Sequence, residues 1–169
     1  VNQGAVASNI RAIISSGYSN RIEISSGGRL IGYGNEQYIG YGAQAAFNTL
    51  TLEGADSLYN ANGQHFYVAT GNTNLSNHLY VGVGGLFTNA NTLFVAAGID
   101  SADNRVTVEG GRLQATALAF NNLMTNRFVL TGGGEATFTR FTVSNVNQRV
   151  EIQGGVLRVQ SALVTNGLP

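Results

Sequence analysis

A short phrase recurs six times along the chain, and this repetition constrains the fold more than any other feature. Each copy begins with Asn or Gln, continues with alternating polar and apolar residues, and then reaches a Gly-containing turn. The copies begin at Asn20, Asn48, Asn77, Asn104, Asn126 and Gln148, and the fourth reads "NRVTVEGGRLQA". Self-similarity at a period of roughly 20 to 50 residues indicates stacked repeat units.

The spacing of the copies divides the units into two groups. The last three units, 104–125, 126–147 and 148–169, have the same length, whereas the first three are longer by five to seven residues. We expect the extra residues to lie late in each longer unit, in "GAQAAF", "GNTNLS" and "GIDSAD". Stacked repeats tolerate insertions of this kind because they leave the stack as loops on one face.

Each unit contains three short segments in which apolar residues alternate with polar ones. In the fourth unit they are 105–108, 113–115 and 118–120. Alternation with a period of two indicates β-strands. Three strands in each unit of 22–29 residues predict an all-β fold, a parallel β-helix (β-solenoid) of six to seven rungs, where a rung is one turn. The prediction is one domain over 1–169, with 1–19 as a partial first rung; an Ig-like sandwich or barrel would not need identical phrases at a fixed phase.

Residues at equivalent positions of successive rungs are expected to stack in columns. The two alternating apolar positions then form two internal aliphatic columns, which end at Val150 and Ile152 in the last unit. The leading Asn or Gln points to the same side as these residues, because side chains alternate along a strand. Buried amides must be hydrogen-bonded. We therefore predict a structural ladder of amides from rung to rung, at Asn20, Asn48, Asn77, Asn104, Asn126 and Gln148; the alternative is that these residues serve only as turn formers.

Composition argues against several classes of function. Charged residues are 11% of the chain, nine Arg balance nine Asp and Glu, and neither Lys nor Cys occurs. A net charge of zero gives no field that attracts nucleic acid. No apolar run approaches the roughly 20 residues that cross a bilayer, so we expect no membrane insertion by this segment. Without Cys, disulfides and thiolate metal sites are excluded.

The phrases "NTLTLEGADSLYN", "NHLYVGVGG", "NTLFVAAG" and "NRVTVEGGRLQATALAF" resemble the repeats of bacterial autotransporter-associated β-strand proteins. The resemblance covers nearly the whole chain and is best over residues 48–120. It implies a passenger-type, right-handed parallel β-helix, export, and an extended scaffold displayed on the cell surface.

Two pairs of acidic residues are candidates for catalytic or metal-binding groups. A glycosidase needs two facing carboxylates about 5–10 Å apart. Glu53 and Glu109 share a turn column two rungs apart, with Gly82 between them, which corresponds to about 9–10 Å; nothing else converges there, so we predict no catalytic residue. Asp100 and Asp103 are weak metal candidates, because Ca²⁺ takes about six to eight oxygen ligands. We expect no metal and no cofactor.

The outward position after the leading Asn or Gln is Arg in the last three units. Arg105, Arg127 and Arg149 would repel one another at rung spacing unless something compensates, and Glu151 lies two residues after Arg149. Arg binds carboxylates through two parallel hydrogen bonds, so one interpretation is contact with a partner or with surface glycans. The other is a solvated edge whose Arg stems cover apolar surface.

These observations predict a non-enzymatic extracellular β-solenoid, structural or adhesive, that is secreted or held at a bacterial cell surface. The chain begins in mid-repeat and stops without a polar cap. Open sheet edges invite pairing, so we expect either copies that stack end to end into filaments or continuation of a longer solenoid. The alternative function is a carbohydrate-binding or carbohydrate-active β-helix of the polysaccharide lyase or glycosidase kind.

Overall fold

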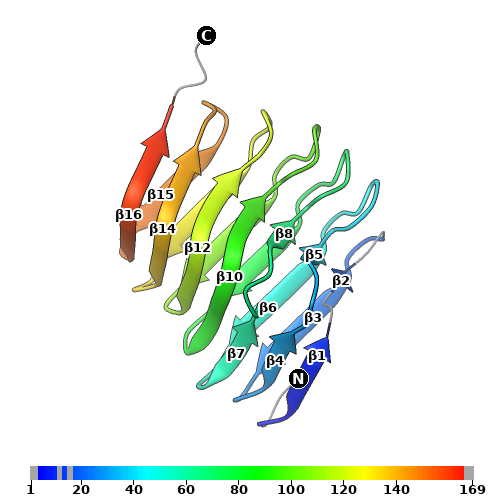
Figure 1. Ribbon diagram of the computed structural model, residues 1–169, viewed down its shortest axis with the longest axis vertical. Coiled ribbons are helices and arrows are strands. Elements are labelled where there is room, and N and C mark those ends of the chain that lie inside the picture. Colours follow the sequence, from blue (N-terminus) through cyan, green and yellow to red (C-terminus); the bar gives the residue numbers. More distant parts are fainter. Residues whose placement is uncertain (1–3, 11–12, 15–16, 166–169) are drawn as a thin grey trace.

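The computed structural model describes residues 4–10, 13–14 and 17–165, and over these residues it consists of strands and turns without a helix. The strands wind into a parallel β-solenoid of about six turns (Figure 1). They are β1 (Val6–Ile10), β2 (Ile13–Ile14), β3 (Arg21–Ser25), β4 (Arg29–Gly32), β5 (Gln37–Ile39), β6 (Thr49–Glu53), β7 (Ser57–Asn60), β8 (Phe66–Val68), β9 (His78–Val81), β10 (Gly85–Val95), β11 (Arg105–Glu109), β12 (Arg112–Phe120), β13 (Arg127–Thr131), β14 (Glu135–Val143), β15 (Arg149–Gln153) and β16 (Val156–Val164).

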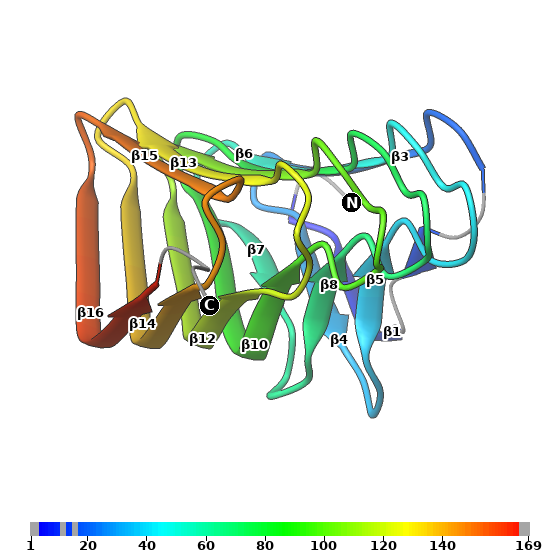
Figure 2. The same cartoon turned by 90° about the horizontal axis from the view of Figure 1, so that it is seen from above.

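Two parallel sheets form the walls of the solenoid. The six-stranded sheet has the order β15-β13-β11-β9-β6-β3, and the ten-stranded sheet follows β1-β4-β7-β10-β12-β14-β16 with β2, β5 and β8 beside this path. Figure 2 shows the sheets as two layers with the interior between them. Each rung crosses the six-stranded sheet and returns through the ten-stranded one, so the predicted parallel β-helix is confirmed.

The number of strands in a rung changes along the chain. The first two full rungs carry two separate strands in the ten-stranded sheet, divided by loops at 33–36 and 61–65. From β10 onward, the expected second and third strands form one continuous strand that bends between Phe87 and Ala90. Asn89 takes a φ of 58° at this bend, a backbone conformation that Asn tolerates better than most residues. Some of the extra length of the first two units therefore lies in these loops and not only late in the unit.

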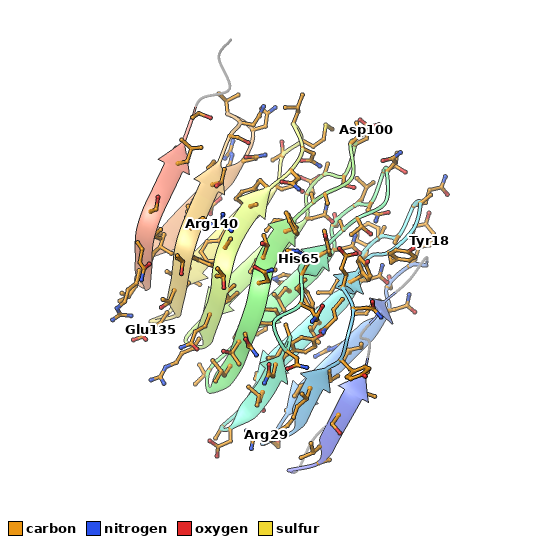
Figure 3. The ribbon with its side chains drawn as sticks, viewed as in Figure 1. Tyr18, Arg29, His65, Asp100, Glu135 and Arg140 are labelled. Carbon is orange, nitrogen blue, oxygen red and sulfur yellow. The ribbon has the colours of Figure 1, made fainter. Side chains whose placement is uncertain are left out.

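The longer loops late in the first three units also stack in register. Parallel bridges join Tyr18 to Ala46, Ala46 to Leu75 and Leu75 to Ala102. The insertions therefore form a small wall of their own along one edge of the rod. Asp100 lies in this row of loops, on the edge opposite Glu135 at the start of β14 (Figure 3).

The core is a set of apolar columns enclosed by the two sheets. Leu52, Val81, Val108 and Leu130 follow one another in register in the six-stranded sheet, and all are fully buried. The next member, Ile152, is 51% exposed. Ile152 keeps its predicted place in the column, opposite Leu130, but it is not buried, because β15 is the edge strand and no described rung covers it.

Candidate functional site

Five Asn side chains form a continuous series of hydrogen bonds along one corner of the interior. In each step the Nδ2 of one Asn donates to the Oδ1 of the Asn in the next rung. The four steps run Asn20–Asn48 at 2.9 Å, Asn48–Asn77 at 2.9 Å, Asn77–Asn104 at 3.1 Å and Asn104–Asn126 at 3.2 Å. We call these five residues the Asn ladder. All but Asn20, at the end of the series, are fully buried.

The backbone reinforces every step of the Asn ladder. In each of the four steps, the accepting Oδ1 also accepts the backbone N–H of the preceding ladder residue, at 2.9–3.1 Å. The second proton of the amide goes to a backbone carbonyl, as from Asn77 Nδ2 to Ala45 O at 2.9 Å. The residue before four ladder members has a positive φ, namely Ser19, Phe47, Ser76 and Asp103. This conformation turns the chain at the corner, where a short polar side chain can reach both the backbone and the neighbouring rung.

Gln148 does not join the Asn ladder. Its side chain is one methylene longer, and it takes different partners: Nε2 donates to Asn122 O at 2.5 Å, and Oε1 accepts from the Ser144 N–H at 3.1 Å. The amide of Asn126 instead donates to Asn122 Oδ1 at 2.9 Å. The ladder therefore has five members rather than the six predicted.

Other buried amides were missed by sequence reasoning. Asn74 accepts the Ala45 N–H and donates to Gly40 O, while Asn122 donates to the carbonyls of Gly98 and Ser101. A signal was present, because these residues stand three and four positions before a ladder Asn, in "NLSN" and "NLMTN". The two amides hold the turn that precedes a ladder Asn, through hydrogen bonds to backbone carbonyls.

Glu53 and Glu109 are kept apart by an aromatic ring. A Cβ on Gly82 would lie 2.8 Å from the Tyr80 ring and 3.1 Å from Glu53 Cβ, so Tyr80 occupies the space over that glycine. Its hydroxyl donates to Glu109 Oε2 at 3.1 Å. Burial, followed by this hydrogen bond and the charge of Glu109, raises the pKa of Tyr80. The two carboxylates thus face a protonated phenol rather than a shared open space.

The acidic loop holds no assembled cation site. Asp100 and Asp103 are both exposed in the loop between β10 and β11. Across residues 4–10, 13–14 and 17–165, no three His, Asp or Glu side chains gather in a way that would hold a metal ion. Asp100 and Asp103 are close in sequence, but among the described residues no His, Asp or Glu of another rung joins them to complete a metal site.

Arg105, Arg127 and Arg149 stand directly in register at the start of β11, β13 and β15. We call these three residues the Arg column. Glu151 pairs with Arg127 of the preceding rung, with Nη1 and Oε1 3.7 Å apart, rather than with Arg149. Within the described residues, Arg105 and Arg149 form no ion pair. Both are exposed.

A hollow of about 400 Å³ adjoins the Arg column, and Ser76, His78, Arg105 and Arg127 are among its lining residues. His78 precedes Arg105 in the same register column, and its Nε2 lies 3.0 Å from Thr107 Oγ1. Burial and the neighbouring Arg105 charge lower the pKa of His78 to about 4. The side chain is therefore neutral near pH 7, and the positive charge of the hollow comes from arginine.

Stacked parallel rungs with an internal amide ladder define the molecule as a β-solenoid. Comparison of the chain with protein-family models, with curated proteins and with solved structures finds no match in any of the three. The resemblance to autotransporter-associated repeats consequently stays a prediction. The part of the chain that the structure describes has no helix of the length and apolar character that a bilayer crossing requires.

Proposed function

We propose that this chain is a non-enzymatic, extracellular β-solenoid that serves as a structural or adhesive scaffold. The Asn ladder is the observation that carries the proposal. In its fully buried members, the side-chain NH₂ group and carbonyl oxygen are already hydrogen-bonded to the corner and to neighbouring rungs, as Asn77 and Asn104 show. Hydrogen bonds that run along the axis through the interior stiffen a rod, and they leave none of these groups for chemistry on a ligand.

The arrangement of the acidic residues supports a non-enzymatic role. Tyr80 fills the space between Glu53 and Glu109 and donates to one of them. An inverting glycosidase needs an unobstructed gap between its carboxylates for a water and the sugar. An assay of reducing-end release from neutral and acidic polysaccharides tests this point. Turnover that is lost in Glu109→Gln would overturn the non-enzymatic assignment and favour a carbohydrate-active β-helix.

The extracellular location rests on composition and on the family resemblance. A chain without Cys cannot form disulfides in the oxidising environment outside the cell. Its low charge and its Gly-rich repeats are shared with the surface-displayed proteins that it resembles. A secreted or surface-bound scaffold is the role that agrees with both features.

We further propose that the last described rung, formed by β15 and β16, is covered by a further rung, supplied either by a second copy stacked end to end or by the continuation of a longer solenoid. β15 is an edge strand of the six-stranded sheet, and β16 is an edge strand of the ten-stranded sheet. Val164 and Ile152 belong to internal columns, yet they are 65% and 51% exposed. A second copy placed on this rung would pair the strand edges and cover these side chains.

Sedimentation velocity and electron microscopy over a range of protein concentrations test the stacking. We expect rods that lengthen with concentration, and we expect Val164→Asp to shorten them. Ile99→Asp is the matched control, because Ile99 is 72% exposed in a loop away from that rung. A chain that stays a monodisperse monomer at every concentration would overturn end-to-end assembly, as would equal shortening by both variants.

A further inference from the structure

The Arg column places three like charges on successive rungs of one outward face. Neighbouring parallel strands lie about 4.8 Å apart, and like charges that are held at such a spacing repel one another. The pairing is fixed by the register of Arg105 with Arg127 and of Arg127 with Arg149. An anion that spans the rungs would relieve the repulsion along the whole column.

The protein itself supplies little compensation for these charges. Of the three arginines of the column, only Arg127 has an ion-pair partner among the described residues, and the distance of 3.7 Å between its Nη1 and Glu151 Oε1 is long for a charge-assisted hydrogen bond. The guanidinium groups of Arg105 and Arg149 therefore remain available. All positive side chains of the protein are Arg, the residue whose planar fork binds carboxylate and sulfate oxygens in pairs.

The hollow beside the Arg column adds neutral groups that suit a sugar. Ser76 and Thr49 provide hydroxyls, and Phe47, which is 55% exposed, provides an apolar wall. Asp103 also lines the hollow, and its single carboxylate opposes the two arginines there. The formal net charge of the residues that line the hollow is thus +1. Arg149 adds a further positive charge on the next rung.

We propose that the Arg column and its hollow bind an acidic polysaccharide, whose carboxylate or sulfate groups lie along the solenoid axis and meet successive arginines. This inference rests on the proposed extracellular scaffold role, because that role makes surface glycans the available polyanions. It does not rest on end-to-end stacking. A chain that binds as a monomer supports the inference whatever the assembly state, so the two proposals can fail separately.

Nucleic acid fits the surface less well than a polysaccharide does. Single strands are bound by a basic groove together with a row of aromatic faces on which bases stack. The aromatic row of this protein, Tyr38, Tyr67 and Phe94, belongs to the ten-stranded sheet, and its rings stack on one another at 5.2 and 4.7 Å between centroids. Their facing surfaces are covered, and Phe47 alone does not make a row.

Two double variants of equal charge test the proposal. Arg105→Gln/Arg149→Gln removes the two unpaired members of the Arg column, and Arg29→Gln/Arg140→Gln is the matched control. All four arginines are exposed and lack ion pairs among the described residues. Arg29 and Arg140 lie on the ten-stranded sheet (Figure 3). Binding to polygalacturonate, heparin, neutral dextran and a single-stranded DNA oligonucleotide is measured by calorimetry, after the unfolding midpoint of each variant has been compared.

We expect the unmodified chain to bind polygalacturonate or heparin and not dextran, and the column variant to lose at least tenfold in affinity while the control loses less than twofold. Polygalacturonate binding alone would identify the anion as carboxylate, and heparin binding alone as sulfate. In the complex the pKa of His78 should rise from about 4, because the bound anion offsets Arg105; nuclear magnetic resonance of the His78 ring reports this. Equal losses in both variants, equal affinity for DNA, or no binding to either polysaccharide would overturn the proposal.

Discussion

Asn77 and Asn104 are 27 residues apart in the chain and joined twice in space. The backbone N–H and the side-chain Nδ2 of Asn77 both donate to the Oδ1 of Asn104, at 2.9 and 3.1 Å. One amide oxygen thus fixes both the main chain and the side chain of the rung before it. Because Asn104 passes the same pair of bonds to Asn126, the corner is held by a repeated two-bond link.

Replacing Asn104 with Ala should strongly destabilise the solenoid. The change leaves the N–H and Nδ2 of Asn77 buried without their acceptor, and each orphaned group costs about 1–3 kcal/mol. We expect the free energy of unfolding to fall by about 3 kcal/mol or more, measured by urea denaturation. Asn121→Ala is the control, since Asn121 is exposed in a turn of the same rung and should change stability by less than about 0.5 kcal/mol. Equal effects of the two variants would show that the ladder bonds contribute nothing beyond the turn.

The Asn ladder could be predicted because its signal is a residue type at a fixed phase. The position of Asn104 before two alternating valines was sufficient to place its amide inside. The exclusion of Gln148 could not be predicted in the same way, because it depends on one methylene and on the nearby Asn122 carbonyl. The position of a residue within the repeat predicts the column in which it stacks, whereas its side-chain length and the neighbouring loop decide which hydrogen-bond partner it reaches.

The bend in β10 and the buried Gln37 were also beyond sequence reasoning. The alternating pattern does not distinguish two short strands from one bent strand, because apolar and polar residues alternate with the same period on either side of the break or the bend. Gln37 is fully buried, although composition gives no reason to place it inside. It fits there because a Cβ on Gly32 would lie 1.9 Å from Gln37 Nε2, so the absence of a side chain at Gly32 creates its space.

Replacing Gly111 with Ala should lower the stability of the fold far more than the same change at Gly133. A Cβ at Gly111 would lie 2.3 Å from Gly82 O and 2.8 Å from Val81 O, both backbone atoms of the preceding rung. At Gly133 nothing lies within 4 Å, and only the φ of 80° opposes a side chain, a strain of about 1–2 kcal/mol. Thermal unfolding of the two variants measures the difference. A smaller loss at Gly111 than at Gly133 would mean that rungs can separate at this corner without penalty.

Removing the hydroxyl of Tyr59 should destabilise the interior without changing its shape. The Tyr59 hydroxyl donates to Gln37 Oε1, and both side chains are fully buried. Tyr59→Phe leaves that oxygen without a donor, at a cost of about 1–3 kcal/mol. Tyr33→Phe is the matched control, because Tyr33 is 60% exposed. An unfolding midpoint that is the same for Tyr59→Phe and for the unmodified chain would contradict the buried pair.

The stability of the protein should fall as the pH is lowered from about 6.5 to about 4, in part because of His78. Burial and Arg105 lower the pKa of this side chain from 6.5 to about 4 in the folded chain. Between these values the unfolded chain binds a proton that the folded chain does not, so the free energy of unfolding decreases with decreasing pH. The full difference is at most about 3 kcal/mol, at 1.36 kcal/mol for each pKa unit.

The variant His78→Gln isolates this contribution from that of the carboxylates, which titrate in both proteins. Gln can still reach Thr107 with a hydrogen bond, but it cannot be protonated. Urea denaturation from pH 7 to pH 4 should therefore give two stability curves that approach each other, or cross, as the pH falls. Curves that stay parallel over the whole range would mean that His78 titrates alike in the folded and unfolded chains.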